Sequence, residues 1–134
     1  DIVVQDQPLR SRDVNGNVLE INLDEAVSAL GDMDLLQRMA TMFLSEWDGH
    51  QVQIQQSLAE RDPGGLQIHA HTLKSLVAMF QAEPTRHAAM ELERLSQQEN
   101  VDWANCARQV EVLFRAMGKI KPALEAFVAG TRTT

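Results

Sequence analysis

Two histidines stand two residues apart in the stretch HAHTLKSLVAMFQA, residues 69–82. The apolar residues of this stretch recur at spacings of three and four, which predicts a helix over residues 65–82. Side chains two residues apart on a helix point about 200° away from each other. His69 and His71 therefore cannot share a metal ion, and the chemistry open to each depends on the helix face that it occupies.

A helical wheel separates the two imidazoles. His71 lies on the outer face and His69 at the boundary of the core side, which is formed by Leu66, Ala70, Leu73, Val77 and Phe80. A neutral imidazole is a good nucleophile near neutral pH, and Lys74, one turn later, can reach an anion attached to it. We expect His71 to be the reactive residue, and His69 to be a boundary residue with a hydrogen-bond partner.

The face around His71 combines small and apolar side chains. Small residues leave a shallow surface through which another protein could approach the ring, and apolar residues flank it in partly exposed positions. Such a patch predicts a docking surface, formed by Gln67, Ile68, Ser75, Ala78 and Met79.

The other candidate residues favour structural roles. His50 lies at helical spacing between Trp47 and Ile54, which predicts packing, and His87 lies on a polar helix face. The single cysteine, Cys106, cannot form an internal disulfide, and no Cys/His pattern indicates zinc. The sequence predicts no metal site.

The elements that would position His71 are all helical. A short helix, capped by Asn22 or Asp24, is predicted to run through Leu30 and to end at Gly31, and longer helices are predicted over residues 32–61, 65–82, 84–98 and from about 102 to 128. Gly49 is the expected weak point of the first long helix, and Pro122 is expected to kink the last. Four long helices with short connections predict an all-α, antiparallel up-down four-helix bundle with a short additional N-terminal helix.

Length and composition predict a single domain with a short tail at each end. The 134 residues divide into a tail or linker (1–22), in which Asn15-Gly16 could form a small hairpin, a bundle domain (23–129) and a C-terminal tail (130–134). The net charge of −7 with scattered basic residues disfavours nucleic acid as a partner. No apolar run approaches about 18 residues and no export signal is present, so we expect no direct membrane contact and a cytoplasmic location.

The stretch AHTLKSLVAMFQA, followed by AAMELERL, resembles the histidine-containing phosphotransfer (HPt) domains of bacterial two-component phosphorelays. The shared pattern comprises Ala70, His71, Leu73, Lys74, small residues at 75 and 78, Ala82 and Leu92-Glu93. The segment LDEAVSALGDMDLLQRMATMFLSE resembles the family's first two helices, so that the resemblance spans residues 22–128. Glycine is usual where Ser75 stands, and frequent where Ala78 and Gln81 stand.

The resemblance implies a phosphocarrier rather than an independent enzyme. His71 would accept a phosphoryl group from the aspartate of a receiver domain and pass it to another receiver, with Lys74 stabilising the phosphate. The domain would need no cofactor, since Mg²⁺ is expected on the receiver. We expect the isolated domain to be a monomer, and the tail to link it to a hybrid sensor kinase as a cytoplasmic C-terminal module.

Two other functions remain open from the sequence. One is the phosphoacceptor domain of a chemotaxis-type histidine kinase, phosphorylated by that protein's own ATP-binding domain. The other is a helical module that binds a receiver or another helix without phosphotransfer.

Overall fold

The computed structural model describes residues 19–130, and over this range the chain forms six helices and no strand. The helices are α2 (Leu23–Leu30), α3 (Met33–Ser45), α4 (Trp47–Ala59), α5 (Pro63–Met79), α6 (Glu83–Ser96) and α7 (Trp103–Ala129). The predicted all-α class is confirmed. The predicted hairpin at Asn15-Gly16 and most of both predicted tails lie outside the described residues.

Polar side chains fix where most of these helices begin. Asn22 accepts a hydrogen bond from the backbone N–H of Glu25 at 3.1 Å at the start of α2. Three aspartates cap α3, α5 and α7 in the same way, namely Asp32, Asp62 and Asp102. Each cap satisfies a backbone donor that the first helical turn leaves unpaired.

The prediction of one long helix over residues 32–61 is wrong, because the helix is interrupted at Glu46 and forms α3 and α4. Gly49, the expected weak point, lies inside α4. The apolar pattern gives no sign of this break, because Phe43 and Trp47 on its two sides are both buried, with ring centroids 5.1 Å apart. Helix α7, by contrast, continues as one helix through Pro122.

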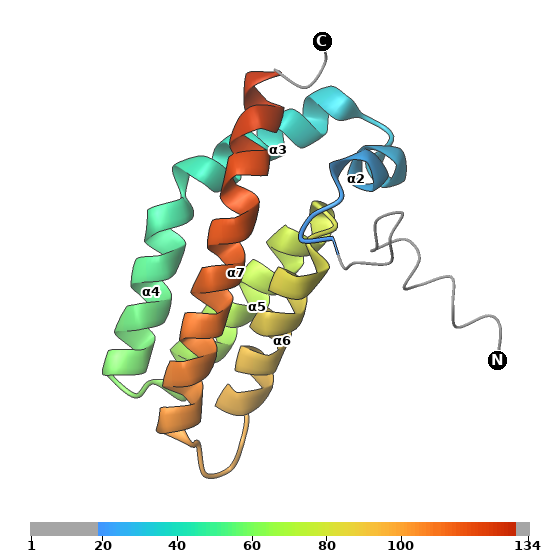
Figure 1. Ribbon diagram of the computed structural model, residues 1–134. Helices are drawn as coiled ribbons and strands as arrows, with labels where there is room; N and C mark the ends of the chain where they lie inside the picture. Colours follow the sequence, from blue (N-terminus) through green and yellow to red (C-terminus); the bar gives the residue numbers. More distant parts are fainter. Residues whose placement is uncertain (1–18, 131–134) are drawn as a thin grey trace, which may run out of the picture.

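Helices α4, α5, α6 and α7 run alongside one another, while α2 and α3 lie at one end (Figure 1). Helix α5 packs against α4 and α6, and α7 packs against α3, α4 and α6. The large side chains that are fully buried come from α3 to α7 and from Phe80, which directly follows α5. They are Leu36, Phe43, Ile54, Leu66, Leu73, Phe80, Leu92, Leu113, Met117, Ile120, Leu124 and Phe127. Within residues 19–130, none of the helices combines the length and the apolar character that crossing a membrane requires.

The connection between α5 and α6 is tight and sets how the two helices face each other. Gln81 adopts a left-handed conformation with φ of 56°, and its carbonyl accepts a hydrogen bond from the backbone N–H of Asn22 at 3.1 Å. Ala82 then leads directly into α6. The short connection places α5 and α6 side by side over most of their length.

Candidate functional site

His71 lies near the middle of α5 and points away from the core. Its side chain is 58% exposed, whereas Leu66, Ala70, Leu73 and Val77 on the other side of α5 are fully buried. The core face predicted by the helical wheel is confirmed. His71 is therefore held in place by α5 while its ring stays accessible.

Glu93 on α6 joins His71 to Lys74. Its Oε2 lies 2.8 Å from Nδ1 of His71, and its Oε1 lies 2.8 Å from Nζ of Lys74. The Glu93 side chain is only 13% exposed, whereas the His71 ring that it contacts is 58% exposed and stays open to solvent. Burial alone would favour the neutral carboxyl, but the hydrogen bonds from Lys74 and His71 outweigh it and lower the pKa of Glu93.

An ionised Glu93 determines which imidazole nitrogen is reactive. A carboxylate only accepts hydrogen bonds, so Nδ1 of His71 must carry the proton and donate it to Oε2. In a neutral imidazole the lone pair then resides on Nε2. The arrangement presents Nε2 as a nucleophile and keeps a cation, Lys74, within the same cluster.

Sequence reasoning placed Glu93 in the family pattern but gave it no role. His71 and Glu93 are 22 positions apart, on different helices, so helical periodicity cannot connect them. A signal did exist, because the two residues lie at equal sequence distances from Ala82 in the α5–α6 connection. Two antiparallel helices with a tight connection bring such positions side by side.

The structure separates the predicted docking residues into two groups. Gln67 and Ile68 line a recess of about 270 Å³ beside His71, together with Thr72 and Glu93. Met79 instead lines a smaller hollow of about 170 Å³ at the end of α5, next to Leu30 of α2. Ser75 is exposed between these two regions, and Ala78 is half-buried.

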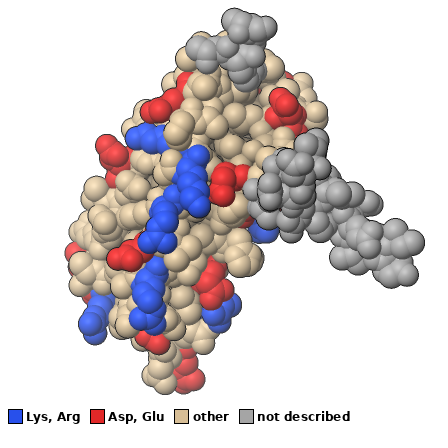
Figure 2. Space-filling view, in the orientation of Figure 1, with Lys and Arg blue, Asp and Glu red and all other residues tan. Residues whose placement is uncertain are grey.

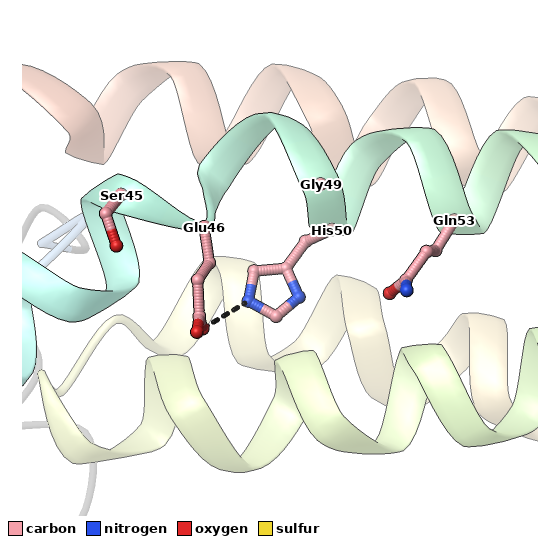
Figure 3. A pocket seen from close by; sticks show the side chains of 5 residues that line it. All are labelled: Ser45, Glu46, Gly49, His50 and Gln53. Carbon is pink, nitrogen blue, oxygen red and sulfur yellow. Dashed lines mark ion pairs between the residues drawn. The ribbon is translucent and has the colours of Figure 1, made fainter.

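A second polar hollow lies at the start of α4, away from the predicted site. This cavity of about 400 Å³ is lined by Ser45, Glu46, Gly49, His50 and Gln53 (Figure 3). Nε2 of His50 lies 3.7 Å from a carboxylate oxygen of Glu46 and has no hydrogen-bond partner among the described residues. Burial, the main cause, lowers the pKa of His50, so its ring is neutral at neutral pH.

The remaining histidines lie near other titratable groups but outside the His71 cluster. His69 is half-buried at the edge of the core and close enough to His50 to contribute to the lowered pKa of that ring. Its side chain makes no hydrogen bond to another residue in the range 19–130, so the hydrogen-bond partner predicted for it is wrong. His87 is exposed on α6, near Glu91. Over the described range, no three His, Cys, Asp or Glu side chains gather closely enough to bind a metal ion. Cys106 is buried, which raises the pKa of its thiol.

Comparison with known proteins gives one match. A family model described as Hpt domain matches residues 38–130, a span that includes α4 to α7 and all of the His71 cluster. No curated protein and no solved structure matches the chain. Because the family match covers more than half of the sequence, the chain belongs to the Hpt domain family, whose members serve histidine phosphotransfer in two-component systems and interact with receiver domains.

Proposed function

We propose that His71 is the phosphoacceptor of this domain. It accepts a phosphoryl group from the aspartyl phosphate of one receiver domain and passes it to the aspartate of another. The observation that carries the proposal is an exposed imidazole whose Nδ1 is bound to Glu93 at 2.8 Å. Lys74 is the residue that stabilises the phosphate.

The proposed transfer is a direct displacement at phosphorus. The lone pair of Nε2 attacks the phosphorus atom, the bond from phosphorus to the aspartyl oxygen breaks, and its electron pair leaves with the receiver's carboxylate. The proton on Nδ1 stays in place, and Glu93 stabilises the positive charge that develops on the ring. In the second transfer a carboxylate attacks phosphorus and the electron pair of the P–N bond returns to Nε2.

In this scheme Lys74 can bind either of two anions, the Glu93 carboxylate or the phosphoryl group. Without phosphate, its Nζ is bound to Glu93 at 2.8 Å. A phosphoryl group on His71, one turn earlier on α5, offers a more highly charged partner within reach of the same side chain. We propose no cofactor for this chain, and place Mg²⁺ on the receiver.

The architecture around the site supports the same proposal. We infer that α4 to α7 form the antiparallel four-helix bundle, with α2 and α3 at one end, and that residues 23–129 make up the domain. The domain is proposed to be a monomer when isolated. In the cell we propose that it is fused to a hybrid sensor kinase.

The experiment is incubation with a receiver domain that carries labelled phosphate. We expect the label to move to this chain and to be acid-labile and base-stable, as a phosphohistidine is. His71→Gln should abolish labelling without unfolding the chain, because the side chain is exposed. His69→Gln is the matched control and should still accept label.

Other outcomes would point to the alternative functions. A chain that binds the receiver but never takes its label is a binding module. A chain that takes label only from an ATP-binding kinase domain, and not from a receiver, is a chemotaxis-type phosphoacceptor. If His71→Gln still took label, another residue would be the phosphoacceptor.

A further inference from the structure

The charges around His71 nearly cancel before any phosphate arrives. Lys74 contributes one positive charge and Glu93 one negative charge, with their charged atoms 2.8 Å apart. An incoming phosphoryl group brings negatively charged oxygens close to the Glu93 carboxylate. Lys74 alone therefore leaves part of that charge without a partner, and additional hydrogen-bond donors are needed.

Two polar side chains beside His71 have no hydrogen-bond partner among the described residues. Gln67 lies one turn before His71 on α5, and Thr72 directly follows it. Neither side chain makes a hydrogen bond to another residue in the range 19–130. Thr72 differs in this from Thr41, which is also exposed on a helix but donates its hydroxyl to the carbonyl of Gln37 at 2.9 Å.

Both side chains line the recess next to the imidazole. The recess has a volume of about 270 Å³ and is bounded by Gln67, Ile68, His71, Thr72 and Glu93. Lys74 is not among these residues, because it lies one turn later along α5. The free amide and hydroxyl donors therefore flank the ring where Lys74 does not.

We propose that Gln67 and Thr72 form a second phosphoryl-oxygen site at His71, in which the Gln67 amide and the Thr72 hydroxyl donate hydrogen bonds to the group in transfer. This inference rests on the phosphocarrier function proposed above. During attack by Nε2 the phosphoryl group keeps its three non-bridging oxygens. Lys74 binds one side of this group, and the two neutral donors bind the other.

The test separates contact with phosphate from contact with the receiver by using a small phosphodonor. Phosphoramidate transfers its phosphoryl group to imidazole as the P–N bond breaks and ammonia leaves, with no protein surface involved. We expect Gln67→Met and Thr72→Val each to slow labelling of His71 roughly threefold to tenfold. The slowing should be similar with phosphoramidate and with a phosphorylated receiver.

Conservative variants and matched controls sharpen the test. Thr72→Ser keeps the hydroxyl and should restore the rate, whereas Gln67→Glu replaces a donor with an anion and should be slower than Gln67→Met. Thr41→Val on α3 and Gln55→Met on α4 are the same chemical changes at exposed positions outside the site, and should leave labelling unchanged. Binding of the unphosphorylated receiver, measured by titration calorimetry, should not change in Thr72→Val, Thr41→Val or Gln55→Met.

The possible results distinguish this inference from the proposed function. Normal labelling of the Gln67 and Thr72 variants by phosphoramidate overturns the inference and leaves the phosphocarrier function intact. Slowing that occurs only with the receiver also overturns it, since the residues would then serve docking. If the wild-type chain takes no label from either donor, the phosphocarrier function itself fails.

Discussion

Glu93 holds two partners with one carboxylate, and this sets the chemistry of His71. The hydrogen bonds to Nδ1 of His71 and to Nζ of Lys74 are both 2.8 Å long. The contact with His71 fixes the tautomer and the orientation of the imidazole. The contact with Lys74 balances the negative charge of the Glu93 carboxylate and so keeps it ionised. Loss of the Glu93 charge should therefore affect the reactivity of a residue on another helix.

The first prediction concerns the rate of transfer to His71. Glu93→Gln keeps the size of the side chain and a hydrogen-bond acceptor but loses the charge. We expect phosphoryl transfer from a receiver to slow roughly tenfold, because charge-assisted hydrogen bonds are about twice as strong as neutral ones. Single-turnover labelling measures this rate. Glu91→Gln, which removes a carboxylate paired with Arg94 on the same helix, should transfer normally.

The second prediction concerns stability against pH. The pKa of Glu93 is lowered in the folded chain from its ordinary value of 4.5, so the folded state binds this proton less tightly than the unfolded state does. The resulting stabilisation is complete above pH 4.5 and is lost as the pH falls below it through the lowered pKa. Chemical denaturation should show Glu93→Gln less stable than wild type at pH 7, with the difference shrinking below pH 4.5. An equal difference in stability between the two proteins at pH 7 and below pH 4.5 would contradict this prediction.

At the scale of the helices, features set by local sequence can be predicted, whereas features set by contacts between distant residues cannot. The start of α7 at Asp102 and the core face of α5 follow from residue type and spacing alone, whereas the choice of Asn22 over Asp24 as the cap of α2 does not. The break at Glu46 does not, because the apolar pattern continues across it. The contact between His71 and Glu93 depends on how α5 and α6 pair, and only the short connection between them hints at it.

The α5–α6 connection itself gives the third prediction. Gln81 has φ of 56°, a conformation that glycine adopts without strain and other residues adopt at a cost of about 1 kcal/mol. This accounts for glycine being frequent here among the domains that the sequence resembles. We expect Gln81→Gly to raise the free energy of unfolding by about 0.5 to 1 kcal/mol, measured by urea denaturation.

A matched substitution tests whether backbone conformation is the cause. Gln97 ends α6 with φ of −93°, where glycine offers no relief and only adds freedom to the unfolded chain. Gln97→Gly should therefore lower stability by up to about 1 kcal/mol. If the two variants were destabilised alike, strain at Gln81 would not be the explanation.

At the scale of the whole molecule, charge is distributed unevenly. The chain carries a net charge of −7, yet on α7 the basic residues outnumber the acidic ones, and Lys and Arg side chains form a row over the face where α7 lies (Figure 2). Arg108, Arg115 and Lys119 are exposed on this helix, while Lys121 lies over the Trp47 ring at 5.4 Å from its centroid. His71 contacts α6 from α5 and belongs to a different face. The two surfaces should therefore act independently.

The fourth prediction uses this separation to locate the receiver-binding face. Ser75 is exposed on α5 one turn beyond His71, so Ser75→Trp places a large side chain where a receiver must approach the ring. We expect this variant to fold normally, to bind a receiver at least roughly tenfold more weakly and to accept its phosphoryl group more slowly. Labelling by phosphoramidate should persist, since a small donor needs no docking surface. Val112→Trp, at a 43% exposed position on α7, is the control and should change neither binding nor transfer. The opposite pattern, with normal transfer by Ser75→Trp and loss by Val112→Trp, would place the receiver on α7 and leave His71 without a route to its partner.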